Sequence, residues 1–315
     1  MPVSAGKSET LPCNLCGGSV FKPALNCEGF SFVRCASCGL VQRNPQLLKE
    51  EIISRYTSDY GKDYLAYELS NETSFLKLQQ LALKDAGFKK IEKELFSRGG
   101  AYRVSCSDVS LNDASCDASY AELKHCEADK PSILDIGCAT GALLVYLRGS
   151  GWRVTGVEIS PSADYAVKER SLDVRNLPLE ENNFPGDSFD VILASHLIEH
   201  LNNPKAFLSE TYRVLKNNGN IFITTPNISG FQARLFGSRW RSAIFDHLFL
   251  FSKSTLFKMM KNAGFKIEGC RTWGGLAAGA APLWLKKPAD ILAKPFGFGD
   301  VMIVRAKKIE AVPKL

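Results

Sequence analysis

The stretch PSILDIGCATGALLVYL, from Pro131 to Leu147, decides the fold class that the sequence indicates. A short apolar run enters a turn with two spaced glycines, and an apolar helical pattern follows it. This order predicts a buried strand, a tight turn and a helix, the unit with which α/β proteins hold a nucleotide at a helix N-terminus. We therefore expect a nucleotide-like ligand at this turn.

The same alternation continues through the rest of the chain. Strand patterns occur at SILDIG (132–137), WRVTGVEI (152–159), LDVRN (172–176), FDVILAS (189–195), NIFITTP (220–226), FKIEGC (265–270) and VMIVRAK (301–307). Helical patterns separate the early strands, so the sequence predicts an α/β fold with a doubly wound, mostly parallel seven-stranded sheet.

The turn itself narrows the choice of ligand. Dinucleotide-binding turns need G-x-G-x-x-G, whereas this turn is spaced Gly137-x-x-x-Gly141 and has Ala139 where a glycine would admit a pyrophosphate. Asp135 at the strand end would repel a diphosphate and attract an ammonium group. Glu158, 21 residues after Gly137, is placed to accept hydrogen bonds from two ribose hydroxyls. A ribose, a cationic amino-acid part and no phosphate indicate S-adenosylmethionine (SAM).

Five segments, in order along the chain, resemble the class I SAM-dependent methyltransferases. They are LDIGCATG, GVEIS, LPLEENNFPGDSFDVILASHLIEHLNNP, RVLKNNGNIFITTPN and HLFLFSKSTLFKMMKNAGFKIEG. The resemblance runs from about Ile133 to Lys307. It implies a Rossmann-like sheet whose seventh strand, at 301–307, is inserted antiparallel, and it implies SAM as the cofactor.

The expected cofactor contacts combine the residue argument with the resemblance. The adenine contact is implied by the resemblance alone, and it falls on Asn176 and Leu177, although the acidic residue often found there in the family is absent. Cys138 is expected to pack or to offer its backbone N–H rather than to act as a nucleophile. The full expected set is Asp135, Gly137, Cys138, Ala139, Gly141, Glu158, Ile159, Asn176, Leu177 and Ser195.

The segment SHLIEHLNNP, after the fourth strand, holds the candidate catalytic residues. His196, Glu199 and His200 are spaced i, i+3, i+4, which gathers three side chains on one face of a helical turn. His196 acts as a general base, or the three residues bind a divalent metal, or they only fix the helix start while catalysis proceeds by proximity. The motif resembles that of ubiquinone-pathway O-methyltransferases, in which an acidic residue stands at the place of His196. We favour the general base.

Two C-x-x-C pairs define the N-terminal module, residues 1–46. Cys13 and Cys16 are followed by Cys35 and Cys38 at the spacing of a zinc ribbon, with disulfides as the competing explanation. So few apolar residues accompany these pairs that the module is expected to need the metal for folding. The segments VRCASCGLVQRNP and YTSDYGKDYLAYE resemble the zinc-ribbon subgroup of these methyltransferases, many of which act on sugars, lipid-linked or polysaccharide precursors, or secondary metabolites.

The remaining sequence divides into three parts. Residues 47–96 have apolar residues at helical spacing and are predicted to form a helical connector. Residues 97–130 are small and polar without periodicity, which predicts a partly disordered insertion. Residues 131–315 form the predicted methyltransferase domain, which is expected to methylate oxygen or carbon.

The distribution of charge suggests what the acceptor is like. The chain has a net charge of +6, and residues 231–315 hold 15 Lys and Arg against 5 Asp and Glu. Arg234, Arg239 and Arg241 lie in a long connection after the fifth strand and are suited to bind a phosphate or carboxylate. The competing explanation is that this segment only packs as an amphipathic helix, through Phe231, Leu235, Phe236 and Trp240.

We therefore expect an anionic small-molecule or glycan-type acceptor. The alternative is a zinc-ribbon RNA methyltransferase, but residues 1–50 hold few basic residues and no basic stripe interleaved with aromatic residues. We expect no nucleic-acid partner. Because residues 1–11 lack an apolar signal core and no run reaches roughly 18 apolar residues, we expect a cytoplasmic protein with at most peripheral membrane contact, through residues 273–285.

Overall fold

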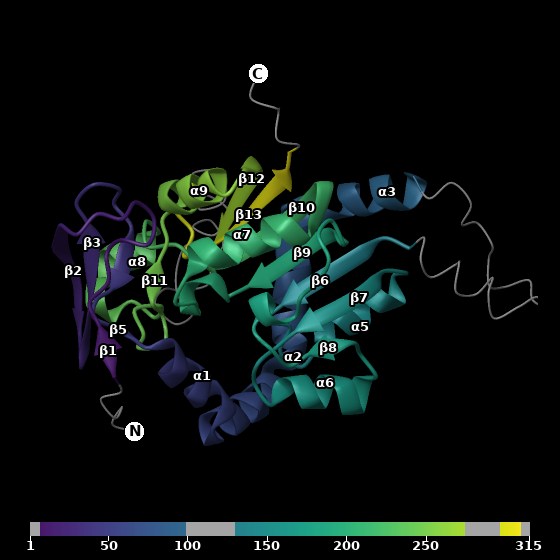
Figure 1. Ribbon diagram of the computed structural model, residues 1–315, viewed down its shortest axis with the longest axis horizontal. Coiled ribbons are helices and arrows are strands. Elements are labelled where there is room, and N and C mark those ends of the chain that lie inside the picture. Colours follow the sequence, from purple (N-terminus) through teal and green to yellow (C-terminus); the bar gives the residue numbers. More distant parts are fainter. Residues whose placement is uncertain (1–6, 99–129, 275–296, 310–315) are drawn as a thin grey trace, which may run out of the picture.

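The computed structural model describes residues 7–98, 130–274 and 297–309. A seven-stranded sheet lies at the centre, and a small β-rich module that includes the N-terminal strands lies at one end (Figure 1). Within these three ranges, no helix is both long enough and apolar enough to cross a lipid bilayer.

The central sheet has the strand order β12-β13-β10-β9-β6-β7-β8. Its strands are β6 (Ser132–Ile136), β7 (Arg153–Val157), β8 (Val174–Arg175), β9 (Phe189–Ser195), β10 (Leu215–Pro226), β12 (Phe265–Trp273) and β13 (Val301–Lys308). The neighbours from β10 to β8 are parallel, whereas β13 runs antiparallel to both β10 and β12. The predicted seven-stranded, mostly parallel sheet and its antiparallel seventh strand are confirmed.

Two strands differ from their predicted bounds. β10 begins earlier than predicted, at Leu215, because its ladder with β9 is interrupted between Leu215 and Asn220 and then resumes. Asn218, within this interruption, has a φ of 63°. β8 is shorter than predicted, since it is the outer strand of the sheet and pairs only with β7.

Helices cover both faces of the sheet, as a doubly wound fold requires. The helices that follow its strands are α5 (Ala142–Gly149), α6 (Ser162–Arg170), α7 (Pro204–Val214), α8 (Phe231–Phe236) and α9 (Lys253–Asn262). Short 3₁₀ turns are η1 (Leu179–Glu181), η2 (Ile198–His200) and η3 (Gly237–Arg239). Successive strand residues point to opposite faces, so Ile133 packs with Leu143 of α5 while Leu134 packs in the cluster that holds Phe207 of α7.

Three helices precede the sheet in the chain. They are α1 (Lys49–Thr57), α2 (Asp59–Asp85) and α3 (Phe88–Arg98), in the region of the predicted helical connector. At the α1–α2 corner a Cβ on Gly61 would lie 2.0 Å from the carbonyl oxygen of Tyr56, so only glycine fits there. α2 contacts α5 and α6, which brings an N-terminal helix against the methyltransferase part. The predicted insertion falls almost entirely on residues 99–129, outside the described residues.

The N-terminal module consists of two small sheets. β1 (Ser8–Glu9) pairs with β5 (Gln46–Leu47), and a second sheet has the order β11-β4-β3-β2. The strands of this second sheet are β2 (Phe21–Cys27), β3 (Phe30–Cys35), β4 (Val41–Arg43) and β11 (Phe249–Leu250). Its fourth strand, β11, comes from a segment some two hundred residues later, so the module shares a sheet with the methyltransferase part.

Candidate active site

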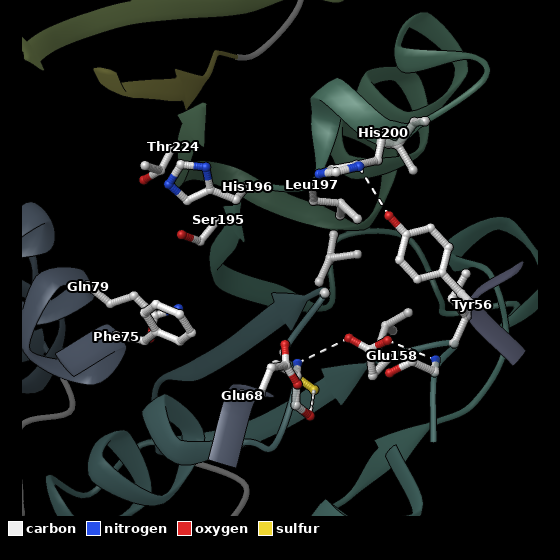
Figure 2. Close-up of a pocket in the computed structure, with 18 of the residues that line it drawn as sticks. Tyr56, Glu68, Phe75, Gln79, Glu158, Ser195, His196, Leu197, His200 and Thr224 are labelled. Carbon is white, nitrogen blue, oxygen red and sulfur yellow. Dashed lines mark hydrogen bonds between the residues drawn. The ribbon is translucent and has the colours of Figure 1, made fainter. Parts of the chain in front are cut away.

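A cavity of about 1370 Å³ opens where β6, β7 and β9 end. Figure 2 shows that Glu158, at the end of β7, and His196, at the end of β9, both face this space. Residues of α1 and α2 complete the wall, among them Tyr56, Glu68 and Phe75. Pockets for one drug-sized ligand are roughly 300–1,000 Å³. The cavity therefore has room for a cofactor and an acceptor side by side.

The glycine turn after β6 forms one end of the cavity. Gly137 and Gly141 have φ values of 74° and 76°, which favour glycine, and Ala139 between them has a φ of 52°. A Cβ on Gly141 would also meet a methyl carbon of Leu172, which would have to shift to make room for it. Gly137, Cys138 and Ala139 line the cavity, as expected for a turn that holds a ligand.

Glu158 is held in place by backbone groups on either side. The N–H of Ala139 donates to its Oε2 (3.1 Å), and the N–H of Ser160 donates to its Oε1 (2.8 Å). Each carboxylate oxygen can accept a further hydrogen bond, because an ionised carboxylate has about four lone-pair positions. Glu158 can therefore receive two hydroxyls of a ribose while it also fixes the glycine turn. Ile159 lines the cavity beside it.

Four of the expected cofactor residues do not line the cavity. Asp135 is buried beneath the turn, and burial, together with the charge of Glu158, raises the pKa of its carboxyl to about 8. Gly141 is the N-cap residue of α5, and Leu177 is about half exposed to solvent. Asn176 donates through its amide to the carbonyls of Glu158 and Ser160, which stabilises the loop after β7.

The segment after β8, on which the adenine contact is expected, reaches the cavity two residues later than predicted. The next two residues, Pro178 and Leu179, line the cavity in place of Asn176 and Leu177. β8 ends at Arg175, and the Asn176 side chain is used to bond the carbonyls of Glu158 and Ser160.

Two carboxylates of α2, neither of them among the residues expected from the sequence, lie close to the glycine turn in the wall of the cavity. Glu68 is buried and accepts a hydrogen bond from Ser162 Oγ (2.8 Å) at the start of α6. Glu72 accepts from Thr140 Oγ1 (2.7 Å) and pairs with Arg170 Nη2 (2.5 Å). Burial raises the pKa of Glu68 to about 7, with further contributions from the charges of Glu158 and Glu72 and opposing hydrogen bonds from Ser162 and Tyr64.

At the other end of the cavity His196 and Glu199 form a pair. His196 follows β9 with a φ of 52°, and its Nδ1 lies 3.2 Å from Oε1 of Glu199. The Glu199 side chain is almost fully buried, and its Oε2 accepts a hydrogen bond from Thr225 Oγ1 (2.9 Å). Burial alone would raise the pKa of Glu199, but the hydrogen bond and charge of His196, with the charges of two further histidines, lower it to about 2. The carboxylate is thus ionised.

The expected helical turn is a short 3₁₀ turn, which changes the grouping of the three residues. The turn covers only Ile198–His200, and His196 lies before it with a left-handed φ of 52°, so the pairing of His196 with Glu199 does not follow from helical spacing. The Nδ1 of His200 donates to the carbonyl of Asp246 (3.0 Å) and lies 3.1 Å from the hydroxyl oxygen of Tyr56 (Figure 2). Ser195, the last residue of β9, lines the cavity next to His196.

A third histidine, His247, joins this group from the segment before β11. Possible metal-ligating atoms of Glu199, His200 and His247 all lie within 4.8 Å of one another. The Nδ1 of His247 donates to the carbonyl of Ser242 (2.8 Å), so its Nε2 is the atom that faces away from that bond. Burial, then the charge of His200, lowers the pKa of His247 to about 4. Neutral imidazoles with Nδ1 bonded to backbone carbonyls and one carboxylate are a donor set that a divalent metal accepts.

The structure distinguishes the three arginines of the connection after β10. Arg241 lines the cavity, and its guanidinium pairs with the buried carboxylate of Asp300. Asp300 also accepts a hydrogen bond from the indole N–H of Trp240, which is itself buried. Arg234 lies over the ring of Phe298, and neither Arg234 nor Arg239 lines the cavity. Of the three, only Arg241 is placed to contact an acceptor.

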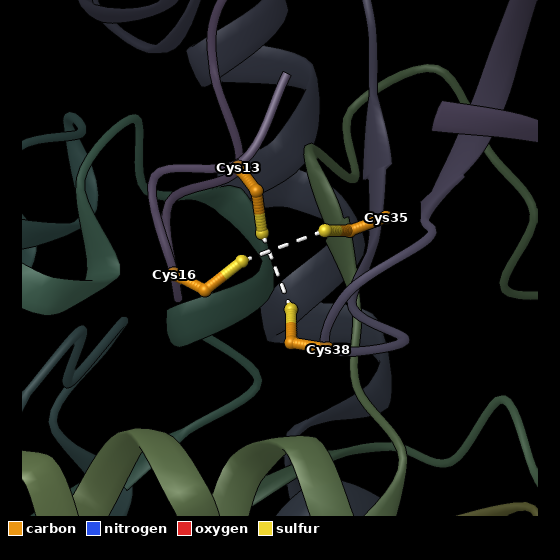
Figure 3. Close-up of side chains that lie close together, drawn as sticks. All are labelled: Cys13, Cys16, Cys35 and Cys38. Carbon is orange, nitrogen blue, oxygen red and sulfur yellow. Dashed lines mark hydrogen bonds between the residues drawn. The ribbon is translucent and has the colours of Figure 1, made fainter. Parts of the chain in front are cut away.

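The four cysteines of the N-terminal module lie together. Figure 3 shows the thiols of Cys13, Cys16, Cys35 and Cys38 pointing toward one another. The Sγ atoms of Cys13 and Cys38 are 3.4 Å apart, and those of Cys16 and Cys35 are 3.5 Å apart. Disulfide sulfurs lie about 2.05 Å apart. Four thiolates at about 2.3 Å around a tetrahedral zinc lie slightly less than 4 Å from one another. The geometry is compatible with one zinc ion and has no disulfide.

A comparison with known protein families matches the part of the chain that holds most of this site. A family model described as a methyltransferase domain matches residues 111–268, half of the chain. The chain belongs to this methyltransferase family. The matched region holds the glycine turn, Glu158 and the His196–Glu199 pair, and it leaves out α2 and the four cysteines.

Individual relatives match over shorter regions. The chain is 36% identical over 105 residues to the mitochondrial ubiquinone biosynthesis O-methyltransferase of Rattus norvegicus, covering 30% of each protein. It is 29% identical over 154 residues to the ubiquinone biosynthesis O-methyltransferase of Rhodopseudomonas palustris (strain TIE-1), covering 45% of this chain and 60% of that protein. The chain thus spans less than two thirds of the length of these curated relatives.

Among solved structures, the chain resembles a SAM-dependent methyltransferase of Thermotoga maritima, described as a possible histamine N-methyltransferase. The two are 23% identical, the TM-score is 0.44, and the match covers 57% of this chain and 83% of the other.

Proposed function

We propose that the protein is a SAM-dependent methyltransferase that transfers a methyl group to a hydroxyl of a small-molecule or glycan-type acceptor. The observation that carries the proposal is the placement of the glycine turn, Glu158 and His196, which is paired with the buried Glu199, around one cavity. Family membership supports the cofactor, and two matched relatives are named O-methyltransferases, which supports oxygen as the methylated atom.

The cofactor end of the cavity fits SAM in shape and charge. Glu158 would receive the ribose hydroxyls, and the backbone of Gly137 to Ala139 would support the amino-acid part. Glu68 adds a carboxylate close to this end, which suits a ligand with a net positive charge. When bound, SAM supplies a methyl group that is already activated for transfer. The protein then has to align the acceptor and exclude water.

His196 is suited to remove the proton of the acceptor hydroxyl. Glu199 accepts the hydrogen bond from Nδ1–H, which fixes the ring tautomer and leaves Nε2 as the basic nitrogen. The ionised carboxylate also stabilises the imidazolium that forms when the proton is taken up, by the logic of a His–carboxylate pair in hydrolases. The His196 side chain is half exposed toward the cavity, so an acceptor can reach it.

The wall of the cavity also holds apolar side chains and a guanidinium that could contact an acceptor. Phe75, Leu78 and Trp273 contribute apolar surface, while Arg241 presents a guanidinium whose Nε is already bonded to Asp300. Arginine N–H groups bind carboxylates and phosphates well. We therefore propose an acceptor that has a hydroxyl near His196 and an anionic group near Arg241. An RNA strand needs an open basic surface instead, which favours the small molecule over the RNA alternative.

A second mechanism is supported by the cluster of Glu199, His200 and His247. A divalent metal at this cluster would lower the pKa of an acceptor hydroxyl, so that a weaker base suffices. We further propose that Cys13, Cys16, Cys35 and Cys38 hold a zinc ion with a structural role, because four protein thiolates leave no open coordination position.

The proposed function is tested by cofactor binding and by product analysis. Calorimetry should show one SAM bound per chain. Mass spectrometry should then detect a mass gain of one methylene on 3,4-dihydroxybenzoate, a phenol with a carboxylate, or on glucose 6-phosphate, a sugar with a phosphate. Absence of SAM binding to the wild-type protein would overturn the proposal. Transfer to RNA oligonucleotides and to neither small molecule would favour the RNA alternative.

A further inference from the structure

Hydrogen bonds from particular residues connect the N-terminal module to the segment that carries His196 and Glu199. We propose that this module is a positioning element for the turn at 196–203, and that Arg43 and Asn14 are the positioning residues. The inference rests on the proposed function, because methyl transfer is the step in which His196 and Glu199 take part.

The first attachment runs through a single residue, Leu248. The backbone N–H of Arg43, the last residue of β4, donates to the carbonyl of Leu248 (2.7 Å). The N–H of Leu248 in turn donates to the carbonyl of Glu199 (2.7 Å). β4 and β11 then continue as paired strands, with Gln42 opposite Phe249. The edge of the module and the backbone of the catalytic carboxylate are thus separated by one residue that bonds to both.

The second attachment uses the Arg43 side chain. It is buried, its Nη1 donates to the carbonyl of Phe245 (2.8 Å), and its guanidinium lies 3.9 Å from the centre of the Phe245 ring. Asp246, the next residue, accepts the Nδ1–H of His200 at its carbonyl and pairs with Arg55 of α1 through its carboxylate (3.0 Å). Arg43 therefore holds the backbone that orients His200.

The third attachment begins between two of the cysteines. Asn14, which lies between Cys13 and Cys16, donates from Nδ2 to Asn203 Oδ1 (3.2 Å) and accepts the backbone N–H of Lys205 at Oδ1 (3.3 Å). Asn203 is the N-cap of α7 and accepts the N–H of Ala206. The loop that a metal would tighten thus contacts the end of the same turn.

The cofactor end of the cavity has no such attachment among the described residues. Glu158 and the glycine turn are fixed by β6 and β7, by each other and by α2. Disturbing the module should therefore move the catalytic pair while leaving cofactor affinity unchanged. A purely structural module would instead lower overall stability and both properties together.

The test compares Arg43→Met, which keeps an apolar side chain of similar length, with Lys22→Met, which removes a charge from exposed β2 of the same sheet. Arg43→Met should retain its metal content and bind SAM as the wild type does. Its kcat should fall by about tenfold or more, since a misplacement of about 1 Å can cost two orders of magnitude. Lys22→Met should match the wild type. Asn14→Ala changes the second, more exposed positioning residue. It should also retain its metal content and SAM binding, and its kcat should fall by a smaller factor.

Histidine ring NMR gives a readout that does not depend on turnover. The sequence has four histidines, three of which are His196, His200 and His247, so their ring signals can be assigned by substitution. The signals of His200 and His247 should shift in Arg43→Met and stay in place in Lys22→Met. Unchanged kcat and unchanged ring signals in Arg43→Met would overturn the proposal, as would an equal loss of SAM affinity. If the wild type transfers no methyl group, the proposed function fails, while the NMR comparison still decides the attachment.

Discussion

The Nδ1 of His196 lies 3.2 Å from Oε1 of Glu199, whose carboxylate is buried and ionised. The pairing is possible because His196 leaves β9 in a left-handed conformation, which turns its side chain back toward the following 3₁₀ turn. In the proposed mechanism this bond fixes the tautomer of the histidine and leaves Nε2 as the nitrogen that takes the proton. A catalytic base at this place has to be assembled from both residues, and each can be tested separately.

His196→Ala should lower kcat by about 10²-fold or more, the usual scale for general-base catalysis, with little change in SAM affinity. Glu199→Gln keeps the shape but removes the charge that stabilises the imidazolium, so its kcat should fall as well. Steady-state rates at saturating acceptor measure both. Full activity in His196→Ala would remove the histidine from the mechanism.

A chelator separates the base from the metal mechanism. If a divalent ion bound by Glu199, His200 and His247 activates the acceptor, EDTA should abolish turnover and added Mg²⁺, Mn²⁺ or Zn²⁺ should restore it. If His196 acts alone, EDTA treatment that leaves the zinc content of the four cysteines unchanged should not alter turnover. We expect the second result. His247→Gln, away from the His196–Glu199 bond, is the matched variant, and under the base mechanism it should retain most of its activity.

Glu158→Ala should weaken SAM binding by about 1.5–3 kcal/mol, the range for hydrogen bonds to a charged group. The effect has two sources, because this carboxylate also accepts the N–H of Ala139 and so supports the glycine turn. Calorimetry measures the affinity. Glu181→Ala is the control, since it removes a half-exposed carboxylate from the rim of the same cavity. If Glu158→Ala bound SAM as tightly as Glu181→Ala, the cofactor assignment would be contradicted.

The sequence predicts those parts of the site that depend on residues close together in the chain. The spacing of Gly137 and Gly141 reflects two left-handed backbone positions, and the place of Glu158 follows from the length of one strand–helix–strand unit. The mostly parallel character of the sheet follows from the alternation of strands with helices, whereas the antiparallel seventh strand is implied only by the resemblance to the methyltransferases. Apart from that strand, each of these depends on contacts between residues close in sequence, so a single sequence is enough to find them.

The parts of the site that the sequence does not predict come from segments distant in the chain or from small errors in where a strand ends. Glu68 on α2 reaches the cavity, and His247 before β11 reaches Glu199 and His200, only through tertiary packing, and an isolated Glu or His in a helix or loop has no distinctive pattern. The adenine contact at Asn176 and Leu177 stays a prediction; Pro178 and Leu179 line the cavity instead, and the end of a two-residue edge strand is poorly defined by sequence. The pairing of β11 with β4 is likewise invisible in either segment alone.

Arg241→Gln should raise the KM for an anionic acceptor by about tenfold, as expected when one charge-assisted hydrogen bond of roughly 1.5 kcal/mol is lost. The substitution also leaves the buried carboxylate of Asp300 without its cation, so Tm should fall. Arg241→Lys, which keeps the charge, should recover part of both properties. Arg239→Gln removes a charge outside the cavity and should change neither. An unchanged KM in Arg241→Gln would place the anion site elsewhere.

Glu68 should make SAM affinity depend on pH. Its pKa is raised to about 7 by burial, with contributions from Glu158 and Glu72, against the hydrogen bonds of Ser162 and Tyr64. Below pH 7 the carboxyl is therefore mainly protonated and neutral. A cationic ligand favours the ionised form, so binding should release a proton, and affinity should rise as pH increases from 6 to 8 and then level off.

The size of this effect follows from proton linkage. If binding lowers the Glu68 pKa by about two units, affinity should be about tenfold higher at pH 8 than at pH 6. Glu68→Gln cannot ionise, and the rise that remains in this variant measures Asp135, whose pKa is also raised. Calorimetry in two buffers of different ionisation enthalpy counts the released proton directly. Ser162→Ala, which removes the hydrogen bond but keeps the carboxyl, should retain the pH dependence. The same pH profile in wild type and Glu68→Gln would show that Glu68 does not sense the cofactor charge.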